Sequence, residues 1–149
     1  GPALPPAFNT GQLASWTVQG GEAERFAGTA LYSLTFDAPA EGGTFALDLG
    51  KVCETARVRL NGEALGTLFM PPYRVNLPAL KKTGNVLEVE VTNLSANRIR
   101  DLDRRGVQWR IMKDINFVNI DYKPFDASKW PDRDSGLLGP VTLLRVSEK

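Results

Sequence analysis

The sequence contains no histidine, and this absence removes a large part of enzyme chemistry from consideration. Histidine is the usual general base near neutral pH, and it activates serine and cysteine nucleophiles. It is also the commonest metal ligand among the side chains. For this chain, a hydrolase of the Ser-His or Cys-His type and a histidine-ligated metal centre are therefore excluded.

The sequence has one cysteine, Cys53, so it can form neither an internal disulfide nor a cysteine-ligated zinc site. Cys53 lies between two apolar segments in LGKVCETARV. A reactive nucleophile would need a basic partner, and the sequence suggests none, whereas free cysteine otherwise behaves as a small hydrophobic residue. We therefore predict a buried, structural thiol.

Long apolar runs and a strong charge are also missing. No run approaches the roughly 18 residues that a membrane-spanning helix needs. The net charge of +1 gives no general attraction to nucleic acid or to an anionic membrane, so we expect neither as a partner. The N-terminal Gly-Pro resembles the scar of a removed expression tag, and we expect residues 1–9 to be a scar and linker that say nothing about localisation.

What the sequence does contain is the pattern of an antiparallel β protein. Ala56, Val58 and Leu60 alternate with two arginines, as in a half-buried strand. Asn61-Gly62 then offers the two positive-φ positions of a tight hairpin turn.

Further alternating segments are separated by turn signals, and we identify no convincing amphipathic helix. We predict strands at 13–18, 30–36, 44–49, 63–69, 73–77, 86–92 and 140–146. Short strands at this spacing favour one all-β domain over residues 10–149, an antiparallel β-sandwich or jelly roll.

The segment 93–139 departs from this rhythm, because it offers only one plausible strand, at 115–121. Loops longer than about 12–15 residues are uncommon in compact domains unless they are functional or disordered. This segment is rich in large aromatic residues, which normally order a loop by packing. We therefore expect an ordered excursion over one end of the sandwich.

In order, FAGTALYSLTF, FALDLGKVCETARVRLNGEALGTLFMPPYRVNL, LKKTGNVLEVEVTN and SGLLGPVTLL resemble the galactose-binding-like jelly roll of glycoside hydrolases. The first part looks like the sugar-binding domain of family 2 enzymes. NLSANRIRDLDRRG followed by DSGLLGPVTL looks more like the C-terminal β-sandwich of family 106 rhamnosidases and related multidomain bacterial proteins. Such rhamnosidases often carry tryptophan-rich insertions in the late loop, whereas this chain has RIRDLDRRGVQWRIMKD there.

The resemblance implies a non-catalytic accessory domain, whose parent carries its catalytic acids on a separate domain. It also implies a secreted or periplasmic location. Domains of this kind often hold a structural calcium, and carboxylates are the ligands that calcium prefers. The calcium candidates in this sequence are Asp101, Asp103, Asp132 and Asp134.

Arginine and aspartate crowd together at 98–110. Arginine can grip a carboxylate or neighbouring hydroxyls with two hydrogen bonds, and aspartate accepts from sugar hydroxyls. On this interpretation Asp103, Arg104 and Arg105 bind a saccharide on which Trp109 stacks, and the arginines favour an acidic glycan. The alternative is an Arg–Asp network that pins the long loop to the sandwich or docks on a catalytic domain.

A second cluster, DYKPFDASKWPDRD, places aromatic rings beside charged groups, which is typical of sugar sites. Tyr122, Lys123 and Trp130 are the candidate ligand-binding residues here. The alternative is a loop plug in which Phe125 and Trp130 cap the core.

Catalysis by this chain alone is not expected. Glu88 and Glu90 share a strand face that we expect to be exposed to solvent, which does not suit a catalytic pair. Asp101 and Asp103 stand among arginines, which would lower the pKa that a general acid needs. We predict a monomeric carbohydrate-binding module of a bacterial polysaccharide-degrading enzyme, which binds a plant or algal glycan, acidic or rhamnose-containing. The alternative is an accessory domain that docks on the catalytic domain of the same parent chain without binding glycan.

Overall fold

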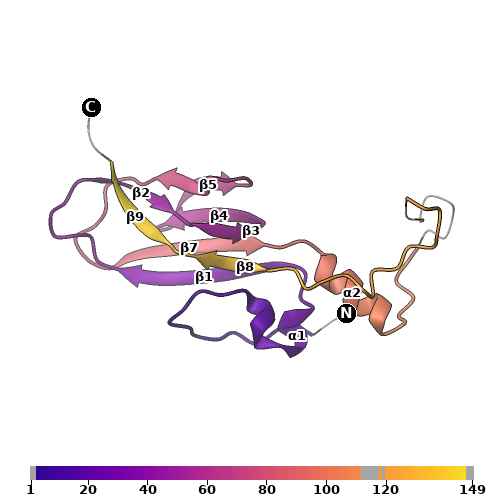
Figure 1. The fold of residues 1–149 in the computed structure, drawn as a ribbon. Coiled ribbons are helices and arrows are strands. Elements are labelled where there is room, and N and C mark those ends of the chain that lie inside the picture. Colours follow the sequence, from indigo (N-terminus) through magenta and orange to yellow (C-terminus); the bar gives the residue numbers. More distant parts are fainter. Residues whose placement is uncertain (1–2, 112–117, 119, 147–149) are drawn as a thin grey trace.

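The computed structural model describes residues 3–111, 118 and 120–146, and it has the architecture of an antiparallel β-sandwich (Figure 1). One layer is a four-stranded sheet in the order β1-β7-β4-β5. Its strands are β1 (Thr29–Phe36), β4 (Thr55–Leu60), β5 (Glu63–Leu68) and β7 (Asn85–Thr92). The fold class expected from the sequence is therefore confirmed.

The opposite layer consists of two smaller sheets, ordered β6-β2-β9 and β3-β8. The strands are β2 (Thr44–Asp48), β3 (Lys51–Cys53), β6 (Arg74–Asn76), β8 (Gly136–Gly139) and β9 (Thr142–Val146). All the strand pairs in these sheets are antiparallel. The last part of the chain thus returns to complete the layer that β2 begins.

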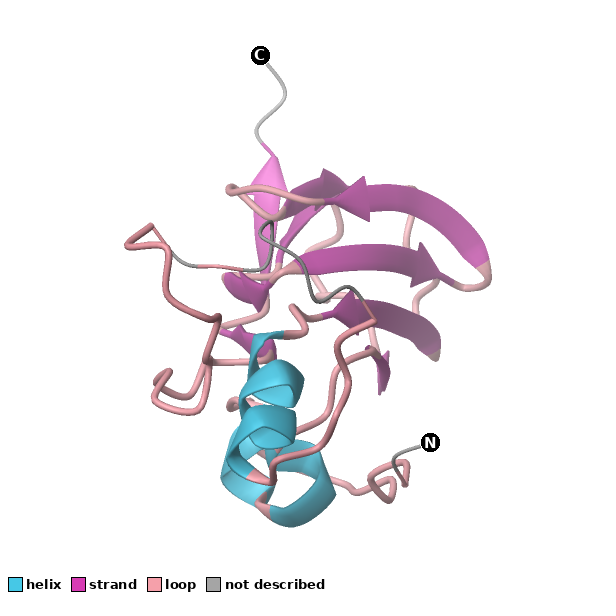
Figure 2. Ribbon diagram, turned by 90° about the vertical axis from the view of Figure 1, so that its right-hand side faces the viewer, coloured by secondary structure: helices cyan, strands magenta, loops and turns pink. Residues whose placement is uncertain are grey.

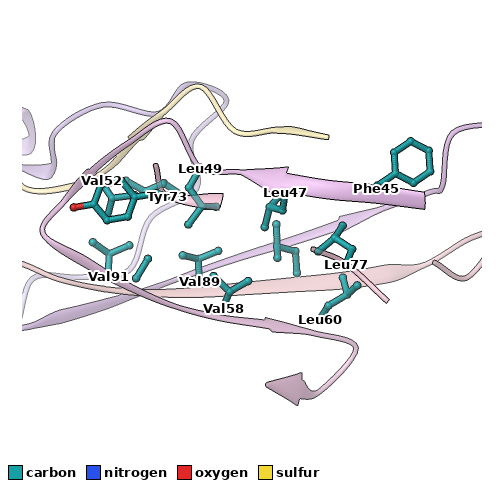
Figure 3. Packing of buried hydrophobic residues seen from close by; sticks show 13 residues of the cluster. Phe45, Leu47, Leu49, Val52, Val58, Leu60, Tyr73, Leu77, Val89 and Val91 are labelled. Carbon is teal, nitrogen blue, oxygen red and sulfur yellow. The ribbon is translucent and has the colours of Figure 1, made fainter. Parts of the chain in front are cut away.

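The core lies between the two layers, where the alternating apolar positions meet (Figure 3). Ala56, Val58 and Leu60 of β4 are buried as predicted, and Leu47 and Leu49 face them from the opposite layer. Burying a side chain of this size stabilises the fold by about 1.5–3 kcal/mol. The strand pattern in the sequence therefore identified the core correctly.

The Asn61-Gly62 turn is confirmed, because φ is 53° at Asn61 and 84° at Gly62, the signs that the predicted hairpin requires. The side chain of Asn61 also accepts a hydrogen bond from the backbone N–H of Val86 at 2.9 Å. The turn thereby joins β4 and β5 and is tied to the start of β7. Cys53 is buried as expected, and burial raises the pKa of its thiol.

Two expectations about local structure were wrong. Residues 13–18 do not form a strand, because a short 3-10 helix, η1 (Trp16–Gln19), begins there, followed by α1 (Gly21–Glu24). The segment 93–139 also contains a helix, α2 (Ala96–Arg104), where none was expected. The strand predicted at 115–121 falls largely outside the described residues.

The helix α2 escaped the sequence pattern because its buried positions are polar. Asn97 and Arg100, one turn apart, are its buried residues. An amphipathic helix is normally identified by apolar residues at this spacing, so a polar buried face gives no such signal. No helix in the described part of the chain is both long enough and apolar enough to cross a bilayer.

We expect Gly50→Ala to destabilise the fold severely. Gly50 has φ +63°, and a Cβ there would lie 2.4 Å from the carbonyl carbon of Gly139, in the neighbouring backbone. Gly84 has a similar φ of +67°, but a Cβ there meets nothing within 4 Å. Gly84→Ala should therefore lower the free energy of unfolding by only about 1 kcal/mol, the strain of a positive φ at alanine. Gly50→Ala should lower it by about 3 kcal/mol or more, because the new Cβ also clashes with the neighbouring backbone.

Urea denaturation measures both variants on the same scale. Equal losses of unfolding free energy in Gly50→Ala and Gly84→Ala would contradict the close approach of the two backbones.

Candidate functional site

The helix α2 lies at one end of the sandwich, the end that faces the viewer in Figure 2, and it carries several of the polar residues singled out from the sequence. Asn97 of α2 donates to the backbone carbonyl of Arg133 at 2.7 Å and accepts from the N–H of the same residue at 2.9 Å. Ser135, also buried, accepts from the side chain of Asn93 at 3.0 Å. These hydrogen bonds fasten α2 to the segment that leads into β8.

Arg100 extends this connection to the N-terminal part of the chain. Its guanidinium is almost fully buried, and it forms ion pairs with Glu24, which ends α1, and with Asp132. Truncating one member of a buried charge pair leaves the other uncompensated, which is strongly destabilising. Arg100 therefore has a structural role, because its ion pairs join α2 to α1 and to the late segment.

Asp103, the last aspartate of α2, binds several groups of the late segment that follows the helix. Its carboxylate accepts from Trp109 Nε1 at 2.7 Å, from Arg110 Nη2 at 2.9 and 3.0 Å, and from the Ala127 N–H at 2.8 Å. The Asp103 side chain is nearly buried. It thus holds together two stretches that the sequence analysis treated as separate clusters.

The aromatic rings of the two clusters pack against one another. Phe125 lies edge-on to Trp109, with ring centroids 6.2 Å apart, and edge-on to Trp130 at 5.5 Å. The Arg110 guanidinium lies 5.2 Å from the centre of the Trp109 ring and 5.5 Å from that of Phe125. Trp109 is therefore engaged by Asp103 and Arg110 and is not an open stacking platform on the face that Arg110 covers.

The other charged candidates also have partners within the chain. Arg105 Nη2 lies 2.6 Å from the Asp101 carboxylate, which also pairs with Arg98 at 3.3 Å. Arg104 Nε donates to the Ser128 carbonyl at 2.8 Å. These contacts match the alternative of an internal Arg–Asp network, and the proposed contact of these side chains with sugar stays a prediction.

The four aspartates proposed for calcium do not converge. Asp101, Asp103 and Asp132 each pair with arginine, and Asp134 pairs with Lys51 at 2.5 Å. Within the described ranges, no group of three or more His, Cys, Asp or Glu side chains is arranged to hold a metal ion. Calcium binding by these residues stays a prediction.

A small groove of about 210 Å³ opens beside this network. It is lined by Asp103, Trp109, Arg110, Phe125 and Asp126, together with residues 106–108. The hydrogen bond from the backbone N–H of Ser128 lowers the pKa of Asp126, so its carboxylate is ionised at neutral pH. The groove therefore offers an anionic acceptor beside an arginine, a pair able to bind hydroxyl groups.

Arg110 and Asp126, which line this groove, were not among the binding residues predicted from the sequence. Arg110 stood in the basic run and Asp126 in the aromatic cluster, so only their residue types pointed to polar chemistry. Arg110 and Asp126 come together because Asp103 binds both the Arg110 guanidinium and the backbone N–H of Ala127, the residue after Asp126. No local spacing rule predicts such a meeting.

The segment that projects past α2 is rich in exposed apolar side chains (Figure 1). We call its described residues, 107–111, 118 and 120–130, the late-loop arm. Ile111 is 98% exposed, Ile120 93% and Tyr122 80%. Val107 and Trp130 are exposed to a smaller extent, and Lys123, with Tyr122, lies on the surface. Large apolar side chains gathered on one segment are typical of an interaction surface.

Comparisons with known proteins place this fold within larger enzymes. No family model matches the chain. The chain is 35% identical to a Formosa agariphila protein named "Putative beta-glucuronidase", over 93% of this chain and 14% of that protein. A rhamnosidase from Novosphingobium sp. PP1Y matches with a TM-score of 0.75 and 31% identity, over 93% of this chain and 13% of that one.

A β-glucuronidase of Bifidobacterium dentium, solved with coumarin-3-O-glucuronide, matches with a TM-score of 0.52 and 26% identity. That match covers 60% of this chain and 16% of the enzyme. The relatives of this chain are thus glycoside hydrolases, and the chain corresponds to a small domain within them. A relationship to glycoside hydrolases, expected from the sequence, is confirmed; the specific domain family stays a prediction.

We expect Asp103→Ala to release the late-loop arm from α2, because three hydrogen-bonding groups lose their acceptor at once. A buried donor left without a partner costs about 1–3 kcal/mol. The amide of Ala127 should then exchange with deuterium on the order of 100-fold faster. Asp126→Ala is the matched control, since that exposed carboxylate accepts from the nearby Ser128 amide. Unchanged protection of Ala127 in Asp103→Ala would contradict the central place of Asp103.

Proposed function

We propose that this chain is a non-catalytic accessory domain of a glycoside hydrolase, and that its late-loop arm docks on the neighbouring catalytic domain of the same parent polypeptide. The observation that carries the proposal is the row of apolar side chains on the arm, with Ile111, Ile120 and Tyr122 almost fully exposed. Leaving such side chains in water forfeits about 1.5–3 kcal/mol each. A packed partner removes that cost.

The charged residues at the end of α2, next to the arm, support docking over sugar recognition. Asp103 and Arg105, two of the residues expected to bind sugar, are engaged with other side chains of the chain. The hydrogen bonds to Asp103 hold the arm in shape, which lowers the conformational entropy that is lost on binding. An arm fixed by polar contacts at its base and apolar at its surface is suited to a protein partner.

The parent follows from the relatives. Most of the length of the Formosa protein and of the Novosphingobium rhamnosidase lies outside the region that matches this chain. We propose that the parent likewise carries a catalytic domain, and that it acts on a glycan containing rhamnose or a uronic acid. Secretion or a periplasmic location would suit such a substrate.

A second candidate function is glycan binding by the domain itself. It is favoured by the groove beside Arg110 and Asp126 and by the exposure of Tyr122 and Trp130, whose rings can cover a sugar. Such an open site would bind one or two sugar units weakly, because few atoms are buried.

Docking predicts that Ile111→Ser combined with Ile120→Ser weakens the association of this domain with the remainder of its parent polypeptide. The loss of two apolar anchors should raise the dissociation constant by at least about 10-fold in isothermal titration calorimetry. Leu31→Ser with Leu34→Ser is the matched control, since these leucines are exposed on β1. If the two double variants bound equally well, the arm would not be the docking surface.

Glycan binding predicts that acidic or rhamnose-containing polysaccharides retard the folded domain in affinity gel electrophoresis, with and without a chelator. Trp130→Ala should abolish the retardation, because the stacking ring is lost. Leu31→Ala, which removes an exposed apolar side chain from β1, should leave it unchanged. Absence of retardation across the panel would remove this second candidate.

A further inference from the structure

We propose that a second surface, the Phe69–Met70 loop between β5 and β6 (residues 69–73), binds the same neighbouring domain as the late-loop arm. The inference rests on the proposed function and extends it, because it makes the docking surface bipartite. Phe69 is 71% exposed and Met70 61%. Two large apolar side chains in sequence at a turn form a compact apolar projection.

The loop that carries this pair is held firmly by its neighbours. Tyr73, which follows the two prolines, is buried, and its hydroxyl donates to the Glu54 carbonyl at 2.7 Å. The Tyr73 carbonyl accepts from the Leu49 N–H at 2.9 Å. The loop is therefore anchored in the core on one side and continues β5 on the other. A projection fixed in this way loses little conformational entropy on binding.

Strand register places this loop at the end of the sandwich where β7 leads into α2, the helix whose far end carries the arm. Leu68, the last residue of β5, pairs with Ala56, and Thr55 pairs with Thr92 at the end of β7. The chain leaves β7 there and enters α2 at Ala96. β5 and β7 flank β4 in the sheet, so the two exits lie about 10 Å apart across it.

Leu94, in the short connection from β7 to α2, adds a further exposed apolar side chain after the exit of β7. By strand register, the loop lies at the end of the sandwich where β7 leads into α2, the end that faces the viewer in Figure 2 and past which the arm projects in Figure 1. A partner that packs along this end of the molecule, from the arm past α2 to the exit of β7, would also meet the Phe69–Met70 loop. Domain interfaces within one chain typically bury about 600–1,500 Å², an area to which both surfaces would contribute.

The occupant that we infer is the neighbouring domain of the same polypeptide. In the relatives, a domain of this kind is embedded in a much longer chain, of which it forms 13–14%. A second copy of this chain and a glycan are the other possible occupants, and the experiment separates them.

Hydroxyl-radical footprinting tests the inference on the full parent polypeptide, with this domain alone as the reference. Phe69 and Met70 report on the loop, while Tyr122 and Trp130 report on the arm. Both pairs should be oxidised about fivefold more slowly in the parent, since a buried interface core excludes solvent. Leu31 and Leu34 of β1 should react equally in the two samples.

The outcomes separate this inference from the proposed function. Protection of Tyr122 and Trp130 without protection of Phe69 and Met70 would leave the docking arm standing and overturn the second surface. Absence of protection at both pairs would overturn both. Protection of Phe69 and Met70 in the domain alone that grows with its concentration would assign the loop to a second copy of this chain. Protection that appears only after addition of polysaccharide would assign it to glycan, and either result would overturn the inference.

A double variant provides an independent readout. Phe69→Ser with Met70→Ser should weaken the association with the remainder of the parent by at least about 10-fold. Because both side chains are exposed, the variant should keep the wild-type urea midpoint. An unchanged dissociation constant with an unchanged midpoint would overturn the inference.

Discussion

The late half of this domain depends on the carboxylate of Asp103. It accepts from an indole, a guanidinium and a backbone amide, and so joins α2 to both ends of the late-loop arm. Hydrogen bonds to a charged acceptor are stronger than neutral ones, and leaving such a nearly buried group unpaired is costly. The arm keeps its shape because this one acceptor is satisfied, while Arg100 and Asn97 fasten the helix beneath it.

These internal contacts bear on how the segment rich in arginine and aspartate is interpreted. The same residue types suit the recognition of an acidic sugar and the stabilisation of a long loop. Here Arg104, Arg105 and Asp103 are engaged within the chain, whereas isoleucine and tyrosine are displayed to solvent. The distribution of satisfied polar groups and exposed apolar groups is the basis of the proposed docking on a protein partner, and the groove beside Arg110 is the basis of the second candidate.

The sandwich itself was predictable because its information is local. A period of two along β4 and β7, and the Asn61-Gly62 turn between strands, fix which side chains face the core before any long-range contact is known. The helix α2 was not predictable in this way, because its buried positions hold Asn97 and Arg100. Polar residues become suitable for burial only when distant partners satisfy them.

The sequence by itself determined the fold class and the core strands, and it excluded histidine-dependent catalysis, an internal disulfide and a cysteine-ligated zinc site, since these follow from composition and from periods along the chain. It also identified the two clusters of the late segment by residue type. Only the tertiary structure decided that Trp109 and Phe125 pack together and that Asp103 accepts hydrogen bonds from within the chain. It also decided that Ile111 and Ile120 face solvent. Hydrogen bonding and exposure depend on partners brought together from distant segments, which no local pattern records.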